Sequence, residues 1–167
     1  FVFTANPEDY TNRGSSLTPL TARLDSEIIT HYPKTIDVGR KITVQYSNIF
    51  LEQQERVSAP DLALDLIEQI AFEARKSEYV DPKSGVSARL TISAYESLVA
   101  AAERRALMNG EKKATLRVSD FIGVVPSITG KVELVYEGEQ EGPAMVAQNL
   151  VGKAIRSQFL LYFPDPD

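Results

Sequence analysis

Three residues of this chain have side chains suited to acting on a phosphate or another anion: Asn6, Arg23 and Arg89. Asn6 directly follows the apolar run 1–5, and an amide at the carboxyl end of a buried strand can orient a water molecule or contact a phosphate oxygen. Arg89 ends the segment Gly85-Val86-Ser87-Ala88-Arg89, just before a predicted helix. A planar guanidinium at that position can bind an anion beside the free amides of the helix end.

Each of these residues also has an ordinary structural role, which spacing alone favours. Asn6 precedes a proline, and this pair is typical of a turn. Arg23 lies among leucines on a predicted short helix and, taken by itself, is a surface arginine. For Arg89 the simplest role is an ion pair with Glu78 or Asp81.

Composition removes several classes of chemistry. The 167 residues include no cysteine, which excludes disulfides, thiolate metal sites and cysteine nucleophiles. The single histidine, His31, cannot form a multi-histidine metal site, and its apolar surroundings favour a structural role. The net charge of −5 argues against a nucleic-acid partner. The sequence also has neither a Gly-x-x-x-x-Gly-Lys-Ser/Thr loop nor a Gly-x-Gly-x-x-Gly turn.

The beginning of the chain predicts a piece of a longer protein. It starts on Phe-Val-Phe, with neither an initiator methionine nor the basic region of a signal peptide. An exposed apolar strand edge promotes aggregation, so we expect neighbouring strands in the intact protein. No apolar stretch approaches the roughly 20 residues that span a bilayer, so we expect no membrane partner.

Residues 1–36 have the pattern of one α/β unit. A strand at 1–5 leads into a loop at 6–16 that is rich in proline, glycine and serine. A short helix is expected from Leu17 to Ser26, and a β-branched strand from Ile28 to Tyr32, ended by Pro33. This alternation is typical of α/β domains.

The remainder, 37–167, predicts a bundle of four or five helices. The segment 39–55 has a weak helical period, carried by Ile42, Tyr46, Ile49 and Phe50, although part of it also suits a strand. A stronger helix opens at Ser58-Ala59-Pro60-Asp61 and leaves Glu68, Glu73, Arg75 and Lys76 largely off its apolar stripe. That stripe consists of Leu62, Leu66, Ile67, Ile70, Ala71 and Ala74.

The clearest helix is predicted to begin at Ser93, because Glu96 three residues later completes a capping box. It should stop at Asn109-Gly110. Another helix can start at Ser119 or Asp120, and a final one follows Gly142-Pro143. Residues 131–136 fit either type of structure.

A basic run at Arg104, Arg105, Lys112, Lys113 and Arg117 is typical of a solvated face. Its charge is balanced by Glu137, Glu139 and Glu141, and complementary patches of this kind can meet between subunits.

Taken together, Phe1–Glu8, Leu17–Leu24 and Gly85–Arg89 resemble the second half of AAA+ ATPases of the MoxR or magnesium-chelatase type. The resemblance implies a mainly α fold: the helical lid of such an ATPase at 37–167, preceded by a small α/β remnant of its P-loop core at 1–36. It also implies a cytoplasmic protein that forms a homo-oligomer, a hexameric ring, and that acts on a partner with a von Willebrand factor A-like domain.

The resemblance gives each candidate residue a role. Asn6 would be the sensor 1 residue that orients the attacking water, and Arg89 would be the sensor 2 arginine that reports the nucleotide state to the lid. Arg23 would be the finger that reaches a neighbouring subunit's nucleotide. The chain departs from the family at Ala22-Arg23-Leu24, where Asp-Arg-Phe is usual, so Arg13 in the preceding loop is an alternative finger.

Two functions follow as hypotheses. In the first, the parent protein is an ATP hydrolase that uses ATP and Mg²⁺, held by segments upstream of Phe1, to remodel a partner protein or insert a metal, while these 167 residues alone bind no cofactor. In the second, the chain is an ATP-independent helical module for protein interaction, which the missing phosphate loop and the helical second part favour.

Overall fold

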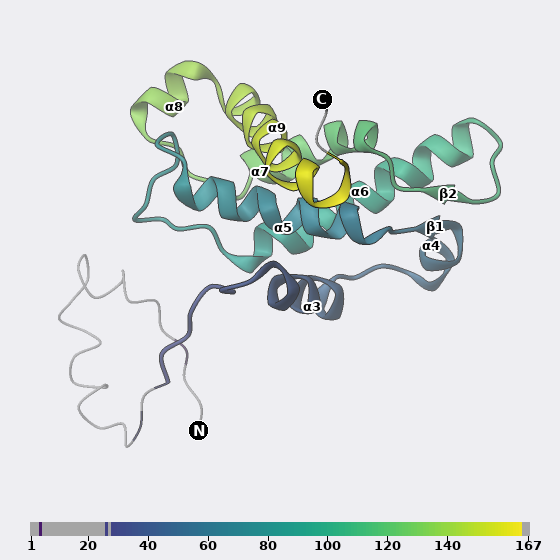
Figure 1. Ribbon diagram of the computed structural model, residues 1–167, viewed down its shortest axis with the longest axis horizontal. Coiled ribbons are helices and arrows are strands. Elements are labelled where there is room, and N and C mark those ends of the chain that lie inside the picture. The colour runs from purple at the N-terminus through teal and green to yellow at the C-terminus, as the bar shows by residue number, and fades with distance from the viewer. Residues whose placement is uncertain (1–3, 5–25, 27, 165–167) are drawn as a thin grey trace. The chain divides into compact units, whose positions relative to one another are not determined.

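The computed structural model describes residues 4, 26 and 28–164 (Figure 1). The chain divides into two units, residues 1–31 and 32–167. The strand predicted at 1–5 and the helix predicted from Leu17 to Ser26 lie outside the described residues, except for Thr4 and Ser26. The elements discussed below belong to the second unit.

The expectation of a mainly α fold is confirmed for the part of the chain that the structure describes, whose only sheet has two short strands. The helices are α3 (Ile36–Tyr46), α4 (Leu51–Arg56), α5 (Asp61–Lys76), α6 (Ala88–Met108), the 3₁₀ helix η1 (Val118–Val124), α7 (Val125–Thr129), α8 (Tyr136–Glu141) and α9 (Pro143–Tyr162). The strands β1 (Val57–Ser58) and β2 (Ala114–Thr115) pair in parallel and were not predicted.

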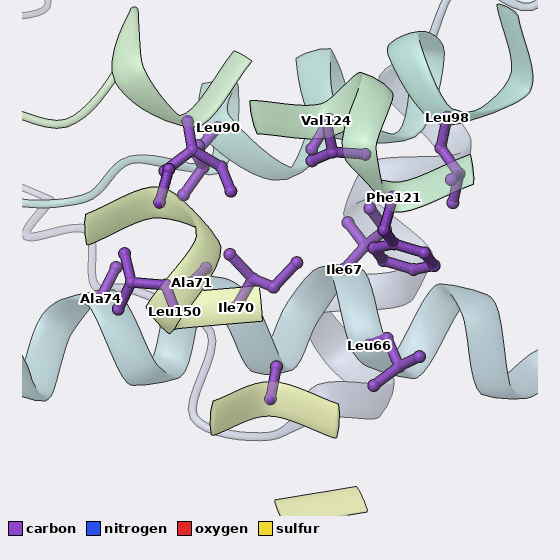
Figure 2. Packing of buried hydrophobic residues seen from close by; sticks show 14 of the residues in the cluster. Leu66, Ile67, Ile70, Ala71, Ala74, Leu90, Leu98, Phe121, Val124 and Leu150 are labelled. Atoms are coloured by element: carbon purple, nitrogen blue, oxygen red, sulfur yellow. The ribbon is translucent and has the colours of Figure 1, made fainter. Parts of the chain in front are cut away.

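Helix α5 is the centre of the core. Its predicted apolar stripe is confirmed from Leu66 to Ala74, while Leu62 is only partly buried. Figure 2 shows Ile67 and Ile70 of α5 beside side chains of α6 and η1, with Leu150 of α9 close to Ala71. Burying each large apolar side chain contributes roughly 1.5–3 kcal/mol. Packing on several sides of α5 therefore holds the helices as one body.

The N-cap of helix α6 lies six residues before the predicted one. Ser87, not Ser93, is its N-cap, and the Ser87 hydroxyl accepts the Arg89 N–H at 3.3 Å. The Ser-x-x-Glu pattern at Ser93 was misleading because the same residues fit the interior of a helix, where the Ser93 carbonyl accepts from Ser127. The predicted stop at Asn109 is confirmed, and Gly110 follows with φ +67°.

The segment 39–55 forms two helices rather than one. Residues 47–50 separate α3 from α4, and the Glu96 carboxylate accepts the Asn48 N–H at 2.7 Å. The predicted stripe is also wrong, because Tyr46 and Phe50 are exposed whereas Gly39 and Thr43 are the buried residues of α3. Gly39 and Thr43 face Glu68 of α5, whose carboxylate needs space and a hydrogen-bond donor.

Two short helices and a bridge complete the fold after α6. The helix predicted from Ser119 or Asp120 is present as η1 and α7, with Ile122 exposed. Residues 131–135 form neither helix nor strand, but Leu134 bridges to Val80. Helix α9 follows Gly142-Pro143 as predicted.

The strand predicted at 28–32 is absent, because the described residues of this segment form neither helix nor strand. Ile28 and Ile29 are 88% and 71% exposed. A strand exists only through hydrogen bonds to a neighbouring strand, and none of the described residues pairs with this one.

Among the described residues, no helix combines the length and the apolar character that crossing a membrane requires.

Candidate functional site

Of the predicted site residues, the structure describes Arg89. Asn6, Arg23 and the alternative finger Arg13 lie outside the described residues, so the structure does not place them relative to Arg89. Within the described part of the chain, no group of three or more histidine, cysteine, aspartate or glutamate side chains is arranged to hold a metal ion.

Arg89 lies within the first turn of α6, not before the helix as predicted. Its side chain is exposed, and no described carboxylate, including those of Glu78 and Asp81, lies within ion-pair distance of it. Helix α6 has 21 residues, so its N-terminus carries the partial positive charge of a long macrodipole. The expected ion pair is therefore not formed, and an exposed guanidinium lies beside the positive end of a helix.

Arg75 is hydrogen-bonded to the loop that precedes Arg89. Arg75 Nε and Nη2 both donate to the Val86 carbonyl, at 3.2 and 3.1 Å. The Arg75 guanidinium lies over the ring of Tyr32, 4.5 Å from its centroid, and 5.4 Å from the ring centroid of Phe72. Burial lowers the pKa of Arg75, while Tyr32 and Glu68 oppose this change. An arginine predicted to lie off the apolar stripe thus holds the loop that precedes Arg89.

Gly85 gives this loop its shape. Its φ of +68° lies in the left-handed region that favours glycine. A Cβ at this position would also overlap Oη of Tyr32. Glycine is therefore required both by the backbone turn and by the close approach of Tyr32.

Behind Arg75 lies a buried polar cluster that consists of Thr43, Glu68 and Thr91, from three different helices. The Glu68 side chain, predicted to lie off the apolar stripe, is in a residue only 2% exposed and accepts from the Thr43 hydroxyl at 2.6 Å. The hydroxyls of Thr43 and Thr91 lie 2.7 Å apart. Gly39 of α3 leaves room for the Glu68 carboxylate, which a Cβ there would overlap.

Burial raises the pKa of Glu68 above its ordinary value of 4.5, although the Thr43 hydrogen bond and the Arg75 charge act against this rise. The cluster therefore joins α3, α5 and α6 through a carboxylate whose charge the Arg75 guanidinium partly compensates.

Sequence reasoning missed both Arg75 and Glu68. On a helix wheel both border the apolar stripe, so their burial depends on which neighbour covers that border. The spacing of Gly39 and Thr43, four residues apart and therefore on one face of α3, was the available signal that a polar group docks there.

The basic run is exposed as expected at Arg104, Lys112, Lys113 and Arg117, and Arg105 is the exception. Arg105 donates to both oxygens of Asp120, at 2.9 and 3.0 Å, and to the Thr115 carbonyl. Lys112 and Lys113, with Arg56, line an open surface depression of about 480 Å³ that also contains Glu52 and Glu55. This depression adjoins α4, near the C-terminal end of α6, and is therefore separate from Arg89. Its mixed charges do not single out one class of ligand.

Comparison with known proteins gives no relative: no family model matches the chain, and no match was found among the curated proteins or among the solved structures.

Proposed function

We propose that this chain is the C-terminal part of a ring-forming AAA+ ATPase of the MoxR or magnesium-chelatase type. The parent protein would couple ATP hydrolysis to remodelling of a partner protein or to metal insertion. One observation carries the proposal: Arg89 is exposed on the first turn of α6, in the Gly85–Arg89 segment that resembles sensor 2, and Arg75 fixes the loop before it.

The surroundings of Arg89 fit a phosphate group. The guanidinium and the helix N-terminus both favour an anion, and a fixed loop limits the entropy that Arg89 loses on binding. The chain has no phosphate loop, so ATP and Mg²⁺ would be gripped by other segments of the parent protein. Bound Mg²⁺ neutralises charge on the phosphoryl oxygens in such enzymes. The role of Arg89 would be to bind a phosphate oxygen and so link the lid to the nucleotide.

Asn6 and Arg23 complete the proposed set through the resemblance alone. Asn6 would orient the water, and Arg23 would supply positive charge to the nucleotide of a neighbouring subunit. A finger that acts in trans requires an oligomer, and head-to-tail contacts that close form a ring. We therefore propose a homo-oligomer, with a von Willebrand factor A-like protein as its partner.

The test of Arg89 is ATP turnover by the intact parent protein. Loss of one charge-assisted contact corresponds to a decrease of about 10- to 100-fold, which we expect for Arg89→Ala. Arg156→Ala is the control, because Arg156 is also an exposed arginine of a long helix but lies on α9. Equal turnover in the native protein and Arg89→Ala would contradict the sensor 2 role.

The finger is tested by mixing. Arg23→Ala should lower turnover by about 10³-fold or more, the smallest effect typical of arginine fingers. Mixing this variant with a subunit that cannot bind ATP but retains Arg23 should restore part of the activity. If Arg13→Ala shows this behaviour instead, the finger is Arg13.

An ATP-independent interaction module is the second candidate. It is favoured by exposed apolar side chains at the end of α9, where Leu160 and Leu161 are 63% and 74% exposed. A parent protein without ATP turnover whose partner binding is lost in Leu161→Ser would support this function over the first.

A further inference from the structure

We infer that Arg75 is the positioning residue for Arg89, and that Tyr32, where the chain enters its second unit, sets the position of Arg75. The inference rests on the proposed function, because it describes what positions the segment that resembles sensor 2. It is carried by contacts among Tyr32, Arg75, Gly85 and Val86.

The first step is the grip of Arg75 on the loop. Two N–H groups of one guanidinium donate to the Val86 carbonyl, which lies one residue before the N-cap of α6. The direction of the first turn therefore depends on where Arg75 lies. Arg75 does not contact the proposed phosphate site itself and acts only through the backbone of 86–89.

The second step is the control of Arg75 by Tyr32. The Tyr32 ring lies against the Arg75 guanidinium, and Oη of Tyr32 occupies the space that a Cβ at Gly85 would need. One aromatic side chain thus contacts both the arginine that holds the loop and the glycine that bends it. On its other side, the Arg75 guanidinium faces Phe72, and its charge interacts with Glu68.

The third step is the place of Tyr32 in the chain. The division between the two units falls between His31 and Tyr32. A shift of the Tyr32 ring would change its contacts with both Arg75 and Gly85. Because Arg89 follows Val86 by only three residues, Tyr32 and Arg75 would act on Arg89 through a short path that includes the hydrogen bonds to the Val86 carbonyl.

Amide hydrogen exchange of the 167-residue chain tests the positioning. The reporter is the Leu90 N–H, which donates to the Ser87 carbonyl at 3.0 Å, and the reference is the Asn109 N–H at the other end of α6. In Arg75→Gln and Tyr32→Leu, we expect Leu90 to exchange about tenfold faster, with Asn109 unchanged. Tyr32→Phe, which keeps the ring over Arg75, should behave as the native chain.

Lys76→Gln is the matched control for charge, because Lys76 is exposed on α5 next to Arg75. Unchanged Leu90 exchange in Arg75→Gln would overturn the inference. Equal acceleration at Leu90 and Asn109 in both Arg75→Gln and Tyr32→Leu would also overturn it, because it would indicate general loosening of the fold. Tyr32 is half exposed, so its variant keeps the test valid if Arg75→Gln does not fold.

Turnover by the parent protein tests the consequence for the proposed function. If Arg75 acts through Arg89, the double variant Arg75→Gln/Arg89→Ala should be no slower than Arg89→Ala alone. Multiplying losses would show that Arg75 acts independently and would overturn the inference. If Arg89→Ala itself changes nothing, the proposed function fails, while the exchange experiment still decides whether Arg75 and Tyr32 position the loop.

Discussion

At the scale of single residues, burial of charge distinguishes this chain from an ordinary helical bundle. Glu68 lies on α5 among apolar residues, with one carboxylate oxygen bound by the Thr43 hydroxyl. A buried carboxylate is costly unless it is hydrogen-bonded or faces a cation. Thr43 and the charge of Arg75 provide these two forms of compensation.

Glu68→Gln is expected to change how stability depends on pH. Burial holds the pKa of Glu68 above 4.5, so between the unfolded and folded pKa values the folded state binds more protons. In that window the Glu68 contribution lowers the free energy of unfolding as pH rises, and the contribution is constant above the folded pKa. Glutamine keeps an acceptor for Thr43 but does not titrate, so the variant should gain stability relative to the native chain as pH rises above 4.5.

Urea unfolding at a series of pH values measures this difference. Glu52→Gln, at an exposed residue of α4, is the control and should follow the native curve. Parallel curves for the native chain and Glu68→Gln would show that Glu68 is not titrating from a buried state.

Gly85→Ala should destabilise the chain more than Gly110→Ala does. Both glycines have nearly the same backbone, with φ of +68° and +67°, so both substitutions carry about 1 kcal/mol of left-handed strain. Gly110 has open space around it, whereas a Cβ at Gly85 displaces Tyr32 from Arg75. The displaced contact adds about 0.5–1 kcal/mol.

Thermal or urea unfolding of the two variants gives the difference. Adding Tyr32→Phe to Gly85→Ala should remove the extra destabilisation relative to Gly110→Ala. Only Oη of Tyr32 would overlap the new Cβ, and the next ring atom lies at an ordinary contact distance from it. An unchanged excess in that double variant would contradict the role given to Tyr32.

At the scale of elements, the ends of α6 are fixed by charge as well as by packing. At its C-terminal end, Arg105 holds η1 through both oxygens of Asp120, and the Arg117 N–H donates to the same carboxylate at 2.8 Å. Burial alone would raise the pKa of Asp120, but the hydrogen bonds from Arg105 and Arg117 outweigh it and hold the pKa below 3.8. The carboxylate thus stays ionised and joins two helices.

Asp120→Asn is expected to lower the free energy of unfolding by about 2 kcal/mol at neutral pH, as is typical for loss of a hydrogen bond between charged groups. Because the folded pKa is lowered, the native contribution is complete above pH 3.8 and is lost as pH falls through the folded value. The difference in free energy of unfolding between the native chain and Asp120→Asn should therefore become smaller in strong acid. For Glu68 the native chain instead loses stability relative to its variant as pH rises.

The control for this pair is Asp37→Asn, which breaks an exposed ion pair with Lys41 in α3. Exposed pairs of this kind contribute little to stability. The assignment would be wrong if, in urea titrations at neutral pH, Asp120→Asn were as stable as Asp37→Asn.

Helix α9 shows how a polar contact sets the register of an apolar helix. Gln158 is buried and donates to Gln69 of α5 at 3.0 Å, and Gln69 donates in turn to Glu73. An apolar face alone tolerates sliding by a turn, but a buried amide must meet its partner. This chain of contacts therefore specifies how α9 lies along α5.

At the scale of the whole second unit, one apolar core joins α5, α6, η1, α7 and α9, and Figure 2 shows part of it. Ile70 is 1% exposed at its centre, so Ile70→Ala should cost about 3 kcal/mol and lower the stability of all these helices together. Ile122→Ala is the matched control, because Ile122 is 77% exposed and its loss should change stability by no more than about 0.5 kcal/mol. Denaturation followed by circular dichroism compares the two, and similar midpoints would contradict the placement of Ile70.

The 167-residue chain by itself is expected to bind ATP too weakly for calorimetry at ordinary concentrations. It carries no phosphate loop, and one arginine at a helix end is a small part of a nucleotide site. Micromolar binding would mean that the nucleotide site lies within these residues and that the proposed division of roles is wrong.

The sequence by itself determined the features that depend on local pattern. The stripe from Leu66 to Ala74 repeats at helical spacing, and Gly142-Pro143 and Asn109-Gly110 are local signals for the ends of α9 and α6. From these signals the mainly α fold followed correctly, because an apolar stripe must be buried whichever helices cover it.

Only the tertiary structure decided what depends on a distant neighbour. The sequence of α5 alone does not distinguish Glu68 or Arg75 from other polar residues. Glu68 is bound by Thr43 of another helix, and Arg75 contacts Tyr32 and Val86, which lie outside α5. The same reason explains the absent strand at 28–32 and the two-residue pairing of β1 with β2, since a strand is defined by its partner. The energy of a charge or a strand depends on what surrounds it, and a linear pattern does not contain those surroundings.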